Sequence, residues 1–252
     1  MPLLSVKDVS VRFGGIVALD RLSFDIEAGH IAGLIGPNGA GKTTLFNCLG
    51  RLYDADQGEI VFDGHSILGM RRCRIAALGI GRTFQNLALF RSLSVVDNIL
   101  LGGHCRARSG FFANALRLPA IAREEAESAD RVRNLVAFLQ LEKVAAMPVS
   151  TLPFGTQKRV ELARALASEP KLLLLDEPAS GLNHEEVDAL AALIREIRDR
   201  LRVTVLLVEH HMNLVMKVSD KVIALDFGRK LAEGTPAAVR SHPDVIRAYL
   251  GS

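Results

Sequence analysis

The chain has 252 residues, of which 49% are hydrophobic and 23% are charged, which is enough material for one large domain with its own core. The formal net charge of +3 is too small to indicate nucleic acid or an anionic membrane as a partner. The three cysteines lack metal-ligand spacing and do not predict a disulfide framework, so we expect a reducing compartment. No signal peptide is expected, and no apolar run approaches the roughly 18–20 residues that span a bilayer.

The first sixty-odd residues alternate in the manner of half-buried strands. Alternate apolar residues are predicted to face the interior, namely Val9, Val11, Phe13, Leu22, Phe24 and Ile26. A further short strand is predicted from Glu59 to Asp63. Cys48 lies in an apolar helical pattern and is expected to be a small core residue.

Three later segments are continuous apolar runs, which suit strands of a parallel sheet that is covered on both faces: Ile31–Ile35, Leu172–Leu175 and Val203–Val208. Helical patterns separate these runs, so a doubly wound α/β core is predicted. Residues 86–152 are mostly helical in pattern and are predicted to form a lobe inserted into that core. Asp220–Thr235 returns to strand character, with a turn in its middle.

A glycine-rich loop follows the first of these strands. The pattern G-x-x-x-x-G-K-[ST] is matched by Gly36, Pro37, Asn38, Gly39, Ala40, Gly41, Lys42, Thr43 and the adjoining Thr44. Glycines let successive N–H groups point at phosphate oxygens, and the next helix presents its positive end to them. Lys42 would add charge near the β- and γ-phosphates of ATP, and Thr43 would offer a hydroxyl to Mg²⁺. This loop predicts nucleotide binding, but it is common to kinases, GTPases, helicases and transport ATPases.

The second apolar run ends in two carboxylates, Asp176 and Glu177. Asp176 at the end of the strand is expected to lie beside the phosphate loop and to hold Mg²⁺. Glu177 is expected to reach a water molecule in line with the γ-phosphate. These residues predict hydrolysis of the nucleotide.

A segment between these two motifs is specific to one family. It runs from Leu152 to Leu166 and contains Pro153, Phe154, Gly155, Thr156 and Gln157. This segment resembles the signature region of ATP-binding-cassette (ABC) ATPases, and the order of all the motifs is that family's order. The resemblance covers essentially the whole chain. It implies a P-loop NTPase core with a parallel sheet, an antiparallel β subdomain and an inserted helical lobe.

The resemblance also implies domain bounds and roles. A single domain would have its catalytic core in residues 1–85 and 153–237, its helical lobe in 86–152 and a tail in 238–252. Phe13 resembles the aromatic residue that stacks on adenine, although a core aromatic at a strand end is the alternative. Gln85 resembles the glutamine that contacts Mg²⁺ and the attacking water.

Two further loops have counterparts in the family. His210 resembles the switch histidine that contacts the γ-phosphate; His211 is its rival, and the order Glu-His favours His210. The segment of Ser180, Gly181, Leu182 and Asn183 resembles the family's loop that crosses the interface between two cassettes. The mechanism implied is ATP hydrolysis between two cassettes that face each other head to tail.

One departure concerns the signature itself. The wider family usually has Leu-Ser-Gly-Gly-Gln, whereas here Pro153 replaces the serine and Phe154 replaces the first glycine. Proline cannot donate a hydrogen bond to the γ-phosphate. We therefore expect the contact across the interface to come from the N–H groups at Gly155 and after it, with the Thr156 hydroxyl as a substitute donor. The alternative is that Thr156 only caps the helix.

Within the family, the chain is most similar to the ATP-binding subunits of branched-chain amino acid importers, notably in Arg82–Gln85, Leu89–Arg91 and Asp244–Gly251. The resemblance implies a second cassette, either identical or a sister, two transmembrane permeases and, indirectly, a periplasmic or extracellular substrate-binding protein. It places the chain at the cytoplasmic face of the membrane, without nucleic acid. The alternatives are an exporter subunit such as a lipopolysaccharide extractor, a non-transport ABC protein and a small-molecule kinase.

Overall fold

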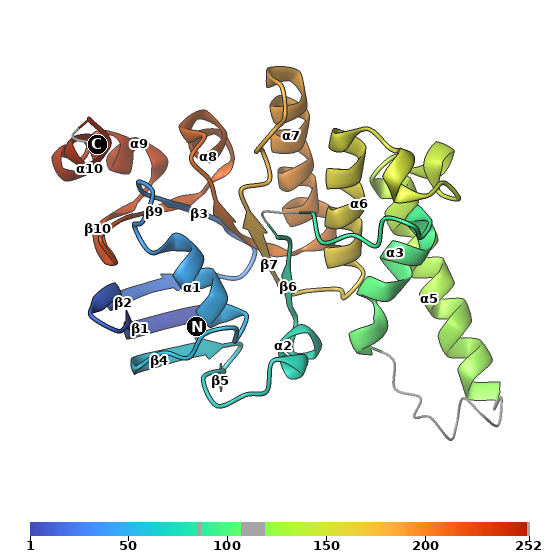
Figure 1. Cartoon of the computed structure of the whole chain (residues 1–252), viewed down its shortest axis with the longest axis horizontal. Coiled ribbons are helices and arrows are strands. Elements are labelled where there is room, and N and C mark those ends of the chain that lie inside the picture. The colour runs from blue at the N-terminus through green and yellow to red at the C-terminus, as the bar shows by residue number, and fades with distance from the viewer. Residues whose placement is uncertain (85–86, 107–118, 251–252) are drawn as a thin grey trace. The chain divides into compact units, whose positions relative to one another are not determined.

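The computed structural model describes residues 1–84, 87–106 and 119–250, so the predicted site residue Gln85 lies outside the described residues. The chain folds into two compact units (Figure 1). The first unit is formed by Met1–Ile75 together with Lys171–Ser252, and the second by Ala76–Pro170. The first unit is therefore discontinuous in sequence, and the second is one continuous insertion. Helix α2 (Cys73–Leu78) lies at the passage between them.

The smaller sheet of the first unit is antiparallel, with the strand order β2-β1-β4-β5. Its strands are β1 (Leu4–Phe13), β2 (Ile16–Ile26), β4 (Gln57–Phe62) and β5 (His65–Ser66). The alternation predicted in β2 is confirmed, because Leu22, Phe24 and Ile26 are buried. In β1 the prediction is wrong for its last residue. The register against β2 shifts after Val11, and Phe13 is 46% exposed at the end of the strand.

The larger sheet supplies the first unit with five strands in the order β10-β9-β3-β8-β7. They are β3 (Ile31–Ile35), β7 (Leu172–Asp176), β8 (Thr204–Val208), β9 (Lys221–Asp226) and β10 (Arg229–Gly234). All are parallel to their neighbours except β10, which is antiparallel to β9. Every residue of β3, β7 and β8 is buried, which confirms the prediction of strands covered on both faces.

The helices of the first unit follow the strands of this sheet. They are α1 (Lys42–Leu49), α7 (His184–Leu201), α8 (Met212–Val218), α9 (Pro236–Arg240) and α10 (Pro243–Leu250). Cys48 in α1 is fully buried, as predicted. Helix α7 begins with a capping box, in which Asn183 and Glu186 each accept a hydrogen bond from the other's backbone N–H.

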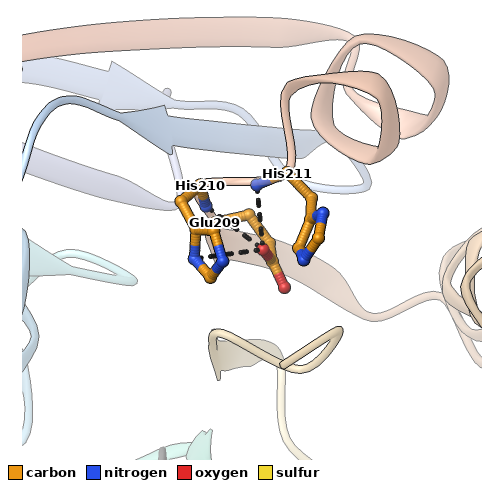
Figure 2. A group of neighbouring side chains, drawn as sticks. All are labelled: Glu209, His210 and His211. Carbon is orange, nitrogen blue, oxygen red and sulfur yellow. Dashed lines mark hydrogen bonds and ion pairs between the residues drawn. The ribbon is translucent and has the colours of Figure 1, made fainter. Parts of the chain in front are cut away.

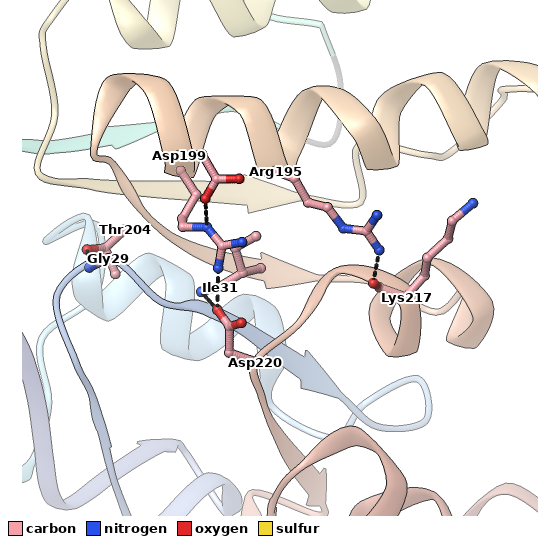
Figure 3. Close-up of polar contacts among 8 residues, drawn as sticks. Gly29, Ile31, Arg195, Asp199, Thr204, Lys217 and Asp220 are labelled. Atoms are coloured by element: carbon pink, nitrogen blue, oxygen red, sulfur yellow. Dashed lines mark hydrogen bonds and ion pairs between the residues drawn. The ribbon is translucent and has the colours of Figure 1, made fainter.

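Polar side chains tie the strands together near their amino ends, as Figure 3 shows. Asp220 Oδ2 accepts hydrogen bonds from Ile31 N at 2.8 Å and from Arg198 Nη1 at 2.9 Å. The Thr204 hydroxyl accepts one from Gly29 N at 2.9 Å. Asp220 precedes β9 and Thr204 begins β8, so β3, β8 and β9 are held at the same end. Their carboxyl ends carry the loops of the predicted site.

In the part of the second unit that the structure describes, the chain is mainly helical, with one short strand, β6 (Ile80–Arg82). The other elements described there are α3 (Val95–Gly102), η1 (His104–Arg106), α5 (Pro119–Phe138), η2 (Glu142–Val144), η3 (Val149–Thr151) and α6 (Phe154–Leu166). Helices α3 and α6 pack closely, because a Cβ on Gly102 would lie 2.0 Å from Arg164 O. Among the described residues, no helix has the length and apolar character that crossing a membrane requires.

Candidate functional site: a phosphate loop and an acid pair

The glycine-rich loop joins the buried strand β3 to helix α1, as predicted. Gly36, Gly39 and Gly41 all have positive φ angles, of 155°, 82° and 99°. Two of them also lack space for a side chain: a Cβ would lie 2.3 Å from Leu225 O at Gly36 and 2.6 Å from Ala18 O at Gly41. The loop therefore needs glycine both for its backbone conformation and for its packing.

Lys42, the first residue of α1, is 8% exposed. Its ammonium donates hydrogen bonds to Gly36 O at 2.7 Å and to Pro37 O at 2.9 Å. Burial lowers the pKa of Lys42, while the negative charges of Glu177 and Asp176 act in the opposite direction. A buried cation that donates to neutral carbonyls inside a glycine loop is well placed to exchange them for phosphate oxygens.

The acid pair lies at the carboxyl end of β7. Asp176 is the last residue of that strand and is 4% exposed. Glu177 follows with a φ angle of 47°, and its N–H donates to Val208 O at 2.9 Å, which ties it to the end of β8. A glutamate in this left-handed conformation is uncommon, and such strain is often held at functional sites.

The histidine of the predicted switch follows β8, and Figure 2 shows its surroundings. His210 Nδ1 lies 3.8 Å from Glu177 Oε2. The imidazole of His211 lies against that of His210, with 4.6 Å between ring centroids and the planes tilted by 35°. His211 is the N-cap residue of α8, so it belongs to the next element. The geometry thus favours His210 over His211 as the partner of Glu177.

Glu209 anchors this loop, a role that the sequence did not reveal. It is fully buried, and its carboxylate accepts a hydrogen bond from Ala179 N at 2.7 Å. It also accepts from His210 N at 3.1 Å and from His211 N at 3.3 Å, as Figure 2 shows. Ligand atoms of Glu209, His210 and His211 lie within 4.8 Å of one another, as in a metal site. However, the carboxylate already holds three backbone N–H groups, so we interpret Glu209 as the anchor that fixes His210 and the interface loop. A glutamate directly after a buried strand was the available signal.

The interface loop connects the acid pair to α7. Ser180 N donates to Glu177 O at 3.1 Å, and Leu182 N donates to Ala179 O at 3.1 Å. Gly181 has a φ angle of 79° and is exposed, and Asn183 caps α7. The loop is therefore built on the same turn as Glu177 and presents its tip to solvent.

Phe13 was predicted to be either an adenine platform or a core aromatic, and its exposure excludes the core. The rings of Phe13 and Tyr53 pack edge to face, with centroids 5.1 Å apart and planes inclined at 72°. Such a pair is favourable and leaves one aromatic face open to stack on a base. Tyr53 was missed, because it lies 40 residues away from Phe13 along the chain.

The signature residues lie in the second unit. Helix α6 begins at Phe154 and has Pro153 as its N-cap, without a side-chain cap, so the alternative of Thr156 as N-cap is wrong. The helix starts earlier because the preset φ of proline suits this position. Thr156 N and Gln157 N both donate to Pro153 O at 3.0 Å, and Gln157 Nε2 donates to Leu152 O at 2.8 Å. The N–H groups of residues 156 and 157 are thus engaged within the helix.

The donor set fits a nucleotide with magnesium. Mg²⁺ takes oxygen ligands, and the described residues predicted to bind it offer the carboxylate of Asp176 and the exposed hydroxyl of Thr43. The side chains at the ends of β3, β7 and β8 can therefore hold phosphates, place a carboxylate near an attacking water and contact a terminal phosphate. This combination defines a P-loop nucleotide hydrolase.

Comparison with known proteins gives a narrower class. The family model described as "ABC transporter" matches residues 19–180, and one described as "Branched-chain amino acid ATP-binding cassette transporter" matches residues 229–252. The chain is 42% identical over 250 residues to the high-affinity branched-chain amino acid transport ATP-binding protein BraF of Pseudomonas aeruginosa, covering 99% of this chain and 98% of that protein. The same values hold for the corresponding protein LivG of Escherichia coli K12.

A solved structure agrees with this class. The ADP conformation of MJ1267, an ATP-binding cassette of an ABC transporter, is 28% identical and superposes with a TM-score of 0.86 over 100% of both chains. The chain therefore belongs to the ABC transporter family, as an ATP-binding subunit that hydrolyses ATP. The predicted family and fold are confirmed.

Proposed function

We propose that the chain is the ATP-hydrolysing subunit of an importer for branched-chain or related amino acids. The observation that carries this proposal is the 42% identity over 99% of the chain to ATP-binding proteins of branched-chain amino acid transport. The match of residues 229–252 to the cassette model of the same transporters supports it. The importer is favoured over the exporter alternative, because a methionine import ATP-binding protein is a further relative, at 38% identity over 97% of this chain.

In this proposal the first unit performs the chemistry. Residues 36–44 hold the phosphates of ATP, with Lys42 releasing Gly36 O and Pro37 O to bind them. Thr43 and Asp176 of the first unit, together with Gln85 of the second, would hold Mg²⁺, which when bound would neutralise charge on the β- and γ-phosphates. Glu177 accepts the proton of the attacking water, and His210 contacts the γ-phosphate. Phe13 stacks on adenine.

The remaining residues require a second cassette. The segment Pro153–Gln157 of one cassette faces the phosphate loop of the other, and Ser180–Asn183 crosses between them. Binding of ATP closes the pair and hydrolysis allows it to open. The second cassette is a sister subunit or a second copy. Two permeases receive the motion at the cytoplasmic face of the membrane, and a periplasmic or extracellular binding protein delivers the amino acid.

Uptake by the source organism tests this proposal. In a strain that lacks the gene for this chain, we expect uptake of radiolabelled leucine, isoleucine or valine at low micromolar concentration to fall to background. The wild-type gene should restore uptake, and a Glu177→Gln gene expressed at the same level should not. Unchanged uptake of these three amino acids, with loss of uptake or export of another compound, would overturn the substrate assignment.

A further inference from the structure

The signature helix carries a buried carboxylate that no step above uses. Glu161 lies in α6 and is 3% exposed. Its Oε1 accepts a hydrogen bond from Phe84 N at 3.1 Å, and the carboxylate also interacts with the backbone N–H of Ala88. Burial raises the pKa of Glu161, whereas these N–H groups and the charges of Lys158 and Arg164 act in the opposite direction. A buried carboxylate is costly unless hydrogen-bonded, so these contacts define its conformation.

Arg164, nearly one helical turn further on, contacts the same segment. Its Nη1 donates a hydrogen bond to Ala88 O. Burial lowers the pKa of Arg164, and the charge of Glu161 opposes that shift. The peptide groups on both sides of Ala88 are thus held by α6, the N–H by Glu161 and the C=O by Arg164. All of these residues belong to the second unit.

These contacts join the signature helix to the backbone on both sides of Gln85 in sequence. Phe84 and Ala88 flank Gln85 and Asn86 in sequence, and Pro153–Gln157 begins the helix that carries Glu161 and Arg164. The backbone before and after Gln85 is therefore attached to the same rigid helix as the signature. Charge-assisted hydrogen bonds are strong and directional, so a displacement of the helix is expected to carry the backbone at Phe84 and Ala88 with it.

We propose that Glu161 and Arg164 are positioning residues for ATP hydrolysis, which tie the backbone at Phe84 and Ala88 to the signature helix so that the two functional segments move together. This inference rests on the proposed function of Gln85 and the signature. It assigns neither residue a contact with ATP. Their loss should affect the rate of hydrolysis at saturating ATP and leave the affinity of the phosphate loop for ATP unchanged.

The test compares two substitutions of Glu161 in the full chain, purified with the second cassette if that is a sister. Glu161→Leu removes the acceptor at similar size, whereas Glu161→Gln keeps an acceptor oxygen. We expect kcat to fall about tenfold in Glu161→Leu and to stay within about threefold of wild type in Glu161→Gln. The Kd for ATP should change by less than about twofold in both. Glu142→Gln, at an exposed position of the same unit, is the matched control.

Amide hydrogen exchange provides a readout that does not depend on activity. The amides of Phe84 and Ala88 should exchange faster in Glu161→Leu than in Glu161→Gln, whereas those within α3 should be unchanged. Wild-type kcat and exchange in Glu161→Leu would overturn the proposal. A parallel loss of kcat, ATP affinity and thermal stability would also overturn it, because it would assign Glu161 a merely structural role. If the wild-type gene supports no amino acid uptake, the proposed function fails. The rates of ATP hydrolysis and of amide exchange in the Glu161 variants still decide this inference.

Discussion

The two compact units hold their functional side chains in different ways. In the first unit, Lys42, Asp176, Glu177 and His210 all lie at or just after the carboxyl ends of buried parallel strands. Their spacing is set by sheet register, by Glu209 and by the turn at Glu177. In the second unit, the signature lies at the start of helix α6. The side chains of Glu161 and Arg164 on that helix hydrogen-bond the backbone at Phe84 and Ala88.

This difference corresponds to two physical tasks. Hydrolysis needs a carboxylate, a cation and an imidazole at fixed separations, and a fully buried sheet provides them with little freedom. The proposed contact with a second cassette needs a helix end that can bind and dissociate in each cycle. Hydrogen bonds on α6 fix the local geometry without requiring the sheet. In the proposed function, the first unit therefore supplies most of the chemistry and the second transmits motion.

The substitution Glu177→Gln should have the largest effect. The amide keeps the size of the side chain and loses the basic oxygen, so kcat should fall by about a hundred- to ten-thousandfold. ATP binding should persist, and dimers with trapped ATP should accumulate. Phosphate release and gel filtration with ATP measure the two effects. Glu185→Gln, an exposed control on α7, should behave as wild type. Normal turnover in Glu177→Gln would contradict the catalytic role of Glu177 at the end of β7.

The sequence predicted the residues of the first unit's site better than their geometry. The phosphate loop and the acid pair carry local signals, because a glycine pattern or an apolar strand ending in two acids has few meanings. The left-handed conformation of Glu177 and the anchoring by Glu209 depend on β8. That strand lies about thirty residues further along the chain from Glu177, so no pattern near Glu177 encodes its conformation, and the position of Glu209 after a buried strand does not name the N–H groups that it binds.

Predictions for the second unit were limited in part by the same cause. The alternative that Thr156 only caps the helix was wrong for a local reason, since Pro153 already stands at the N-cap position. Glu161 reads as an ordinary helical glutamate in the sequence, because the backbone that it holds lies 77 residues before it. Likewise, exposure of Phe13 follows from a register shift in β1 that its apolar alternation does not reveal. Contacts between distant segments decide the surroundings of Glu161 and Phe13, whereas the start of the helix follows from proline itself.

Cysteine labelling compares a buried thiol of the first unit with a half-buried thiol of the second. Burial raises the pKa of the Cys48 thiol to about 11. Burial also raises the pKa of the Cys105 thiol, whose side chain is only half-buried. Cys48 is inaccessible and has little reactive thiolate at pH 8, so it should react with iodoacetamide more slowly than Cys105. Mass spectrometry of a Cys73→Ser variant, which lacks the exposed thiol, measures both rates. Equal rates would show that the first unit opens often enough to expose Cys48.

The substitution Lys42→Ala tests the cation of the phosphate loop. It removes a charge-assisted hydrogen bond worth roughly 1.5–3 kcal/mol, so ATP affinity should weaken about ten- to a hundredfold, and hydrolysis should fall with it. Calorimetric titration with ATP measures the change, with Lys7→Ala as an exposed control. An unchanged Kd would mean that the ammonium stays with Gly36 O and Pro37 O when nucleotide binds.

The smallest effect is expected in the second unit, at Thr156. Thr156 N and Gln157 N already donate to Pro153 O, so they are poor donors to the ATP of the other cassette. The Thr156 hydroxyl is therefore the donor that this prediction tests. Thr156→Val should weaken ATP-driven dimerisation about fivefold, or by about 1 kcal/mol. Adding Pro153→Ser should restore part of it, because serine supplies the missing hydroxyl. Dimerisation is measured in a Glu177→Gln background, with the sister cassette present if there is one. If Thr156→Val lowers only thermal stability and leaves dimerisation unchanged, Thr156 serves the helix alone, and the contact falls to the N–H groups of Phe154 and Gly155.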